Sequence, residues 1–348
     1  SAGGCVGLKP RVGVVSMSSP LEVGADRSAR VLAEVSDALR TAGCDVVYAG
    51  AVNTPDDAVR AGVTLAGLRP DAIVAVPACW FEDYLAVDLI EECGAPILFW
   101  PQPGMETGAL CGAQQTAAML CAMKHPCALV FGAADDRSCR IDAIRFLIAC
   151  ALHSRLRRAR IGLLGRRVNG MTHTAANEYL LKKAIGPRLV HLDPSILGLK
   201  AGAAEGEATT IRLWRELRGR AGQCDVTDAD GEAAVRVYRA LRAAVAEHGL
   251  SAVAVGCYPA LMGKVCLAAT LLADEGIPMA CEGDVHGAVG QLILTWLTRQ
   301  PTHHTDWLDP VDPESVVFTH CGSGSWSLAE KPEAVHLAPV RLMTQGVC

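Results

Sequence analysis

Short apolar runs alternate with amphipathic stretches along most of the chain, and this alternation constrains the fold more than any other feature. The first five runs lie at residues 11–17, 45–49, 71–77, 96–100 and 128–132, and the segments between them have the apolar spacing of helices. Strands that are apolar throughout are typical of a parallel sheet with helices on both faces. We therefore expect a doubly wound, flavodoxin-like α/β domain over residues 1–157.

The same alternation begins again at residues 160–165 and ends in the stretch from 252 to 290. Within that stretch we predict strands at 252–256 and 278–280 and helices at 260–273 and 285–297. Gly276 follows the first of these helices at a position that favours a left-handed C-cap. We also expect helices at 211–218 and 232–248 and a loop at 199–209. Together these segments make a second Rossmann-like α/β domain over residues 158–310.

The last part of the chain has a different sequence pattern. Residues 299–313 show no regular pattern, whereas 316–320 and 335–342 have the composition of strands. We expect residues 311–348 to be the beginning of a β-rich C-terminal module. Two strands do not make an independent core, so this module must pack on the second domain or on further sequence.

Composition excludes several classes of function. The chain has 348 residues, is 51 % hydrophobic and carries a net charge of −5, so no basic footprint for nucleic acid is present. No glycine-rich phosphate or dinucleotide fingerprint occurs, so no nucleotide cofactor is expected. No apolar stretch is long enough to span a bilayer, and no signal-peptide pattern opens the chain. The 15 cysteines include no CxxC pair, which favours reduced thiols and a cytoplasmic location.

Glu282 and Asp284 are the first candidates for a functional site. They follow the predicted strand at 278–280, and ligands of open α/β sheets bind outside the carboxyl ends of the strands. Two carboxylates this close repel each other unless a cation or a proton lies between them or the side chains diverge. Divalent cations with a preference for oxygen ligands would stabilise such a pair. The alternative for Asp284 is that it caps the helix that follows, a role for which Asp is well suited.

Histidines and cysteines surround this pair in the sequence. His320 ends a predicted strand, where a single His is by itself more often structural than a ligand. His303 and His304 are expected to be surface residues, because adjacent loop side chains need not converge. The thiols of Cys257, Cys266, Cys281 and Cys321 could bind zinc or an iron–sulfur cluster. Their irregular spacing favours buried free thiols instead.

The predicted N-terminal domain offers Trp80 and Gln102, which come after the strands at 71–77 and 96–100. An indole could stack on the apolar face of a sugar ring, and an amide could bond to sugar hydroxyls. The alternative for Trp80, and for the nearby Trp100, is a hydrophobic lid over the edge of the sheet.

Several motifs resemble those of the L-fucose isomerase-like family, which is related to the L-fucose and L-arabinose isomerases. The most specific are CYPALMGKVCLAATLLADEGIPMACEGDVHGAVG at 257–290 and THCG at 319–322, with Asp306 between them. Weaker matches are GMETGALCG at 104–112 and IGLLGRRVNGMT at 161–172. By this resemblance a C-terminal domain follows in the family, and we expect this chain to lack most of it.

The resemblance implies specific roles. Glu282 matches a metal-binding carboxylate that could also act as a base, and His320 matches a His near the metal and the substrate. Met171 occupies the turn of a substrate-side Met. The family has a second metal-binding Glu near Cys257, so a thiol stands where a carboxylate is expected, and thiolates favour softer metals. The resemblance further implies a divalent ion, Mn²⁺, and a trimeric or hexameric homo-oligomer whose active site lies between subunits.

Two functions follow from these expectations. The first is a metal-dependent aldose–ketose isomerase that acts on a sugar through an ene-diol, with Glu282 and Asp284 as catalytic residues. In this case Trp80, Gln102, Met171 and Cys257 would line the sugar site. The second is a non-catalytic sugar-binding or regulatory protein built from two Rossmann-like lobes, which needs no metal. A redox protein that uses the thiols is a third possibility.

Overall fold

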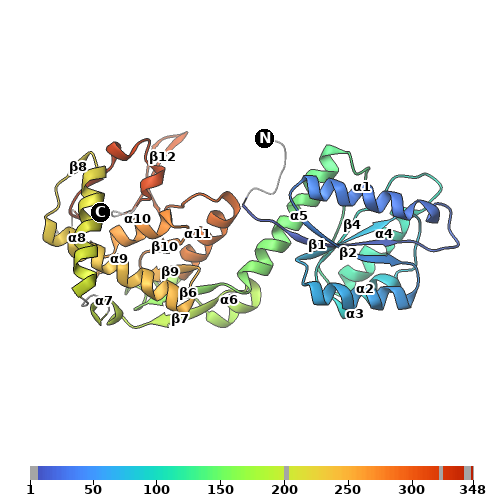
Figure 1. The fold of residues 1–348 in the computed structure, drawn as a ribbon, viewed down its shortest axis with the longest axis horizontal. Helices are drawn as coiled ribbons and strands as arrows, with labels where there is room; N and C mark the ends of the chain where they lie inside the picture. The colour runs from blue at the N-terminus through green and yellow to red at the C-terminus, as the bar shows by residue number, and fades with distance from the viewer. Residues whose placement is uncertain (1–6, 200–203, 321–323, 341–345, 348) are drawn as a thin grey trace. The chain divides into compact units, whose positions relative to one another are not determined.

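The computed structural model describes residues 7–199, 204–320, 324–340 and 346–347 and divides into two compact units, Ser1–Arg155 and Leu156–Cys348 (Figure 1). Each unit contains a parallel sheet packed against helices, which confirms the predicted Rossmann-like α/β class. The second unit includes residues 311–348, where we predicted the start of a separate module.

The first unit is built on a five-stranded parallel sheet with the order β2-β1-β3-β4-β5, the order of flavodoxin-like folds. Its elements are β1 (Arg11–Met17), η1 (Ala25–Arg27), α1 (Ser28–Thr41), β2 (Asp45–Val52), α2 (Pro55–Leu68), β3 (Ala72–Pro77), α3 (Tyr84–Glu92), β4 (Ile97–Phe99), α4 (Ala109–Ala122), β5 (Cys127–Leu129) and α5 (Arg137–Leu156).

Helices cover both faces of this sheet. One face packs against α1 and α5 through a cluster that includes Val35 and Leu147. The other face packs against α2, α3 and α4 through a cluster that includes Leu65, Leu89 and Leu120. The central strands are therefore buried on both sides, as their apolar sequences predict.

The second unit contains a four-stranded parallel sheet with the order β10-β9-β6-β7. Its elements are β6 (Arg160–Leu164), η2 (Thr172–Thr174), α6 (Glu178–Ala184), β7 (Arg188–Leu192), α7 (Ile196–Leu199), α8 (Ala204–Arg220), β8 (Gln223–Cys224), α9 (Asp228–His248), β9 (Ala252–Val255), α10 (Cys266–Asp274), β10 (Met279–Ala280), α11 (Val285–Thr298), β11 (Asp306–Asp312), β12 (Ser315–Thr319), η3 (Trp326–Leu328), η4 (Pro332–Ala334) and β13 (His336–Leu337).

Helices α9 and α10 pack on this sheet through a shared cluster that includes Leu241, Leu272 and Val253. Helix α8 packs on α9 through the buried Trp214, whose indole N–H donates to Asp228 at 2.8 Å. Helix α11 lies against β9 and β10. Helix α11, which follows β10 in the sequence, is therefore packed against β10 and its neighbour β9.

Two predicted element boundaries in this unit are wrong. The segment 199–209 is not all loop, because α8 already begins at Ala204; its Ala and Glu residues are good helix formers. Residues 200–203 lie outside the described part of the chain. Helix α10 begins at Cys266 and not at residue 260. Gly263, with φ 76°, accepts a hydrogen bond from the backbone of Val347 at 3.0 Å, so the chain turns there.

The C-terminal strands also differ from the prediction. Residues 306–312, predicted to be irregular, form β11, which pairs with β12 in an exposed antiparallel hairpin where Trp307 is opposite Phe318. Of the strand predicted at 335–342, His336–Leu337 is a strand, and it pairs in parallel with β8 rather than with the hairpin. Residues 341 and 342 lie outside the described residues.

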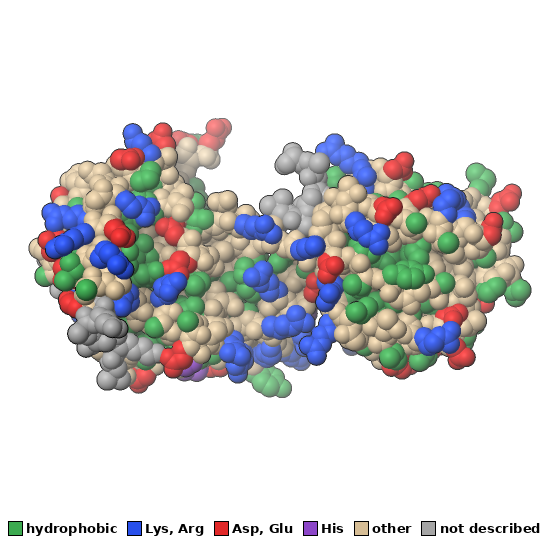
Figure 2. Space-filling view, in the orientation of Figure 1, with side chains coloured by type: hydrophobic (Ala, Val, Ile, Leu, Met, Phe, Trp, Pro, Cys, Tyr) green, Lys and Arg blue, Asp and Glu red, His purple; other side chains and the backbone are tan. Residues whose placement is uncertain are grey.

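None of the helices among the described residues is long and apolar enough to cross a membrane. Both basic and acidic side chains are scattered over the visible face of each unit (Figure 2). This distribution agrees with the small net charge of −5.

Candidate active site

Three loops meet at the carboxyl edge of the second sheet, where the residues after β6, β9 and β10 contact one another. The backbone N–H of Gly256 donates to Leu164 at 2.9 Å, and that of Gly283 donates to Val255 at 2.9 Å. The N–H of Val168 donates to the carbonyl oxygen of Glu282 at 3.2 Å. The turn that carries the two predicted carboxylates is thus held by both neighbouring loops.

Two glycines make this approach possible. A Cβ on Gly256 would lie 2.0 Å from the carbonyl oxygen of Arg166, and a Cβ on Gly283 would lie 2.8 Å from the Cα of Arg167. Gly283 also has φ +70°, and Glu282 beside it has φ 65°. A left-handed conformation costs a residue with a side chain about 1–2 kcal/mol. The surrounding contacts therefore hold Glu282 in a strained conformation, which is common at functional sites.

Asp284 caps α11, as one of the two interpretations predicts. Its Oδ1 accepts from the backbone of Gly287 at 2.9 Å, and its Oδ2 lies 3.5 Å from Nε2 of His304. Burial favours the neutral acid, but the hydrogen bonds from His304 and Gly287 and the His304 charge outweigh it and lower the pKa of Asp284. Asp284 is therefore an ionised residue whose two oxygens both have partners.

His304 belongs to this site, so the prediction that it is a surface residue is wrong. Its Nδ1 accepts from the N–H of Cys281 at 3.4 Å, which places the ring proton on Nε2, facing Asp284. Its ring stacks on His320, with 5.3 Å between the centroids. The side chain of His320 is only 2 % exposed, and its Nε2 lies 3.9 Å from Oδ2 of Asp306. No local signal marked His304, because the chain returns to the turn only after the whole of α11.

A cavity of about 400 Å³ lies beside these histidines. Its lining combines polar and apolar side chains: Leu267, Thr270, His303, Thr319, His320, Gly324, Ser325, Trp326, Leu328, Ala329, Val335, His336 and Leu337. His303, whose side chain is otherwise exposed, reaches this cavity. The hollow therefore borders the buried ring of His320.

The cysteines near the site are buried. The sulfur of Cys257 accepts from the N–H of Glu282 at 3.4 Å, and Cys257 and Cys281 both belong to the core of the unit. Cys266 is buried as well. Cys321 and Gly322, which complete the THCG motif, lie outside the described residues. Over the described part of the chain, no three His, Cys, Asp or Glu residues converge as a bound metal ion would require.

The other predicted substrate residues are divided between the two units. Met171 is half-buried in the loop after β6, where its N–H donates to Val168 at 3.2 Å. In the first unit, Gln102 is buried, its side-chain amide donates to the backbone carbonyl of Trp100 at 3.2 Å, and its backbone carbonyl accepts from Arg27 at 2.9 Å. Trp80 is half-buried beside Gly108.

Trp100 is fully buried in the core, and its indole donates to Gly132 at 3.0 Å. It is therefore a core residue and not a lid over the edge of the sheet. Tyr258 was not predicted as a site residue, but its side chain is 54 % exposed immediately after β9. An exposed aromatic residue beside the Glu282 turn is suited to stack on a sugar ring.

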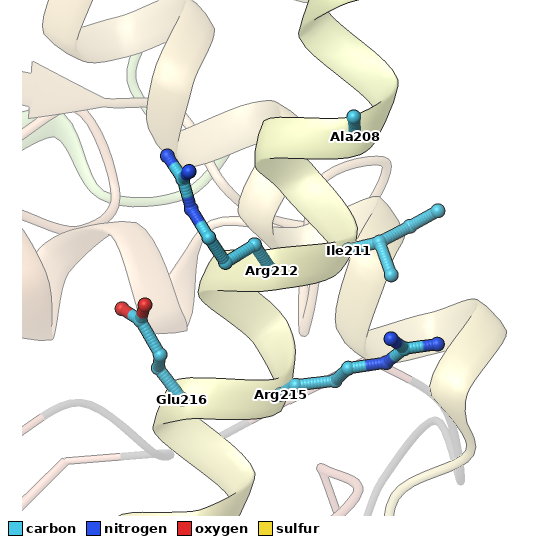
Figure 3. Close-up of a pocket in the computed structure, with 5 residues that line it drawn as sticks. All are labelled: Ala208, Ile211, Arg212, Arg215 and Glu216. Atoms are coloured by element: carbon cyan, nitrogen blue, oxygen red, sulfur yellow. The ribbon is translucent and has the colours of Figure 1, made fainter.

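A larger hollow, of about 600 Å³, lies on α8 and not at the sheet edge. Ala208, Ile211, Arg212, Arg215 and Glu216 line it, and Figure 3 shows their side chains spreading away from a single helix. Because it has one wall and no converging polar groups, we do not consider it the functional site.

Comparison with known proteins points to sugar isomerases. The chain is 25 % identical over 282 residues to a sulfoquinovose isomerase of Priestia aryabhattai, which covers 76 % of this chain and 62 % of that protein. It is 24 % identical over 296 residues to that of Alkalicoccus urumqiensis (80 % and 66 %) and 29 % identical over 248 residues to that of a Clostridium species, strain MSTE9 (67 % and 55 %). These relatives are sugar isomerases by name. The chain spans less than two thirds of their length.

This similarity supports a relationship with sugar isomerases, whereas membership of the L-fucose isomerase-like family stays a prediction. A scan against models of known protein families found no match. A solute-binding protein from Actinobacillus succinogenes with bound D-allose aligns over 89 % of this chain and 97 % of its own, with 13 % identity and a TM-score of 0.23. An arabinose-binding protein from Shewanella aligns with 11 % identity and the same TM-score of 0.23. Scores this low support no conclusion.

Proposed function

We propose that this protein is an aldose–ketose isomerase that acts on a sugar at the carboxyl edge of the β10-β9-β6-β7 sheet. The observation that carries the proposal is the Glu282 turn, whose strained carboxylate-bearing residue is held between the loops that follow β6 and β9. The similarity to proteins named sulfoquinovose isomerase supports the same chemistry and suggests sulfoquinovose as the first substrate to assay.

Glu282 is the proposed base. Isomerisation moves the proton on the carbon next to the carbonyl, and a carboxylate can carry it between the two carbons of an ene-diol. Asp284 is less suited to this task, because its oxygens are engaged by Gly287 and His304. Its proposed role is to hold the turn at the start of α11 and to orient His304, which in turn stacks on His320.

The family resemblance implies a divalent ion, Mn²⁺, and we propose it for this enzyme. Glu282 and His320 would be its ligands, but together they do not make a complete site. Among residues 7–199, 204–320, 324–340 and 346–347, no three candidate ligands converge, and Cys257 takes the place of the expected Glu. An ion bound here would need further donors, and we derive no catalytic step from it. A homo-oligomer is likewise implied by the family resemblance and is a proposal.

Solvent exchange tests the base. Wild-type protein incubated in D₂O with sulfoquinovose should incorporate deuterium at the carbon next to the carbonyl, followed by NMR. Glu282→Gln should lower this rate by about 10²–10⁴-fold, the usual contribution of a positioned base. Glu247→Gln is the control, because Glu247 lies near the end of α9, at the opposite edge of the sheet. Exchange that is unchanged in Glu282→Gln would refute the assignment.

The incomplete set of ligands favours the second function, a sugar-binding protein without catalysis. Metal analysis separates the two. About one manganese, zinc or magnesium ion per chain that is lost in Glu282→Ala supports the metal-dependent enzyme. Sugar binding without metal and without solvent exchange supports the binding protein, and iron or colour would indicate redox chemistry of the thiols.

A further inference from the structure

We infer that Cys121 and Cys127, in the first unit, form a reversible disulfide when a small-molecule disulfide such as oxidised glutathione is present. Neither residue takes part in the Glu282 turn, so this inference does not depend on the proposed function. It rests on the distance between the two sulfur atoms, on the backbone contacts that maintain this distance, and on the different accessibility of the two thiols.

The two sulfur atoms are already in contact. The Sγ atoms of Cys121 and Cys127 lie 3.5 Å apart, and a disulfide bond is about 2.05 Å long. The sulfurs therefore have to approach by only about 1.5 Å to reach bonding distance. The Cys127 thiol also donates to the backbone carbonyl of Ala117 at 3.7 Å. Ala117 lies one helical turn before Cys121, so the Cys127 sulfur rests against the last turn of α4.

The fold maintains this contact from both sides. Cys121 belongs to the last turn of α4, and Cys127 begins β5, which pairs with β4. The segment between them is anchored as well, because the N–H of His125 donates to Leu120 at 2.9 Å and its ring Nε2 lies 3.1 Å from the carbonyl oxygen of Ala95. The two thiols are thus neighbours because the helix and the strand are fixed, and not only because they are close in the sequence CAMKHPC.

The two thiols differ in exposure, and this difference assigns their order of reaction. Cys121 is exposed, whereas Cys127 is half-buried. Burial, together with the hydrogen bond and charge interaction with Cys121, raises the pKa of Cys127 to about 11. A half-buried thiol with a high pKa reacts slowly with an oxidant from solution, because the thiolate is the reactive form. Cys121 is therefore the sulfur that meets the oxidant.

The reaction is thiol–disulfide exchange in two steps. The Cys121 thiolate attacks one sulfur of the oxidant, forms a mixed disulfide and releases the first thiolate. The Cys127 thiol then loses its proton to solvent, attacks the Cys121 sulfur and releases the second thiolate. The two cysteines lose two electrons, and the oxidant is reduced to two thiols. In the second step Cys121 no longer carries the charge that raises the pKa of Cys127, and the attacking sulfur starts next to its target.

The bond would fasten the end of α4 to β5, which lies at one edge of the first sheet. In the reduced protein these two elements are joined by the packing of Ala117 and Cys127 against the same core. The loop that the bond closes is short, so the expected gain in stability is small. The state of the pair is therefore best read from its chemistry and not from a melting temperature.

Tryptic mapping tests the pair. The folded protein is incubated with oxidised glutathione at neutral pH, its free thiols are alkylated, and it is then digested. Trypsin cleaves after Lys124, between the two cysteines, and Cys127 is the single cysteine of the peptide 125–137. In the wild type, most of this peptide should be disulfide-linked to the peptide that ends at Lys124 and contains Cys121. Dithiothreitol should release it.

Three variants assign the link. In Cys121→Ser the linked form should fall at least about tenfold, because the sulfur next to Cys127 is lost. In Cys127→Ser the reaction should stop at the mixed disulfide of Cys121 with glutathione. Cys111→Ser is the control, because Cys111 is an exposed thiol of the same helix, and the link should form in this variant as in the wild type.

A wild type in which Cys121 stays a mixed disulfide, or in which Cys127 stays open to alkylation, would overturn the inference. A link that persists in Cys121→Ser would do the same, since Cys127 would then be joined to another thiol. These measurements involve no sugar and no turnover, so their result is independent of the isomerase.

Discussion

Asp284 makes two contacts that differ in their need for charge, so two substitutions separate them. The cap to Gly287 needs only an oxygen acceptor, whereas the contact with His304 is strengthened by the negative charge. Asp284→Ala removes both and should lower the free energy of unfolding by about 0.5–2 kcal/mol, the usual value of an N-cap. Asp284→Asn keeps the cap and should lose less. Urea denaturation at pH 7 measures both.

The pH dependence of this difference gives a second measurement. The pKa of Asp284 is lower in the folded protein than in an unfolded chain. Its charge therefore contributes stability that is present above the unfolded pKa, about 3.9, and is lost as the pH falls through the folded value. The gap between wild type and Asp284→Asn should shrink as the pH falls from about 5 toward 3. A gap that widens over this range would contradict the sign of this shift.

Sequence reasoning placed Glu282 and Asp284 in the turn after a strand, where the structure has them, and missed the residues that contact this turn from elsewhere in the chain. The position of Glu282 and Asp284 after a buried strand predicted the turn, and Asp before a helix predicted the cap. His304 could not be predicted in this way, since its contact with Asp284 depends on how the chain folds back after α11. The approach of Arg167 to Gly283 likewise depends on the sheet order, which places β9 between β6 and β10.

The local sequence pattern was sufficient to predict the strands of the two large parallel sheets. It was not sufficient for strands that form only because they pair with another segment. The central strands of both sheets are mainly apolar runs, and their sequences predict burial on two faces. Strand β11 is fully exposed, and its Asp residues and Pro310 disfavour a strand, so it forms by pairing with β12. The two-residue pairing of β8 with β13 joins segments more than 100 residues apart and has no local signal.

The packing of α8 on α9 gives a prediction with an internal control. Gly231 in α9 lies against Trp214, and a Cβ there would be 2.1 Å from the indole. Since Trp214 is only 1 % exposed, it has little room to move, and Gly231→Ala should destabilise the protein by about 1–3 kcal/mol. Gly290 in α11 has nothing within 4 Å, so Gly290→Ala should stabilise it by about 0.5–1 kcal/mol. Chemical denaturation that gives both variants the same sign would refute this packing.

At the scale of the whole molecule, the two units bury separate cores. The clusters on the two faces of the first sheet consist of residues from the first unit, and the cluster around β9, α9 and α10 consists of residues from the second. Every contact that we assign to the Glu282 turn comes from the second unit, whereas Trp80 and Gln102 belong to the first. A substrate role for Trp80 or Gln102 therefore has to be tested in the whole chain. The Glu282 turn, in contrast, depends only on contacts within the second unit.

Because its core is self-contained, residues 1–157 expressed alone should fold and unfold cooperatively, with a helical circular dichroism spectrum. Ending the fragment at 157 keeps α5, which covers one face of the sheet and runs from Arg137 to Leu156. Leu98 is fully buried in that core, so Leu98→Ala should cost about 2–5 kcal/mol. The cost should be the same in the fragment and in the whole chain, measured by urea denaturation, since the contacts of Leu98 lie within the unit. A fragment without a cooperative transition, or a much smaller cost there, would show that this core needs the rest of the molecule.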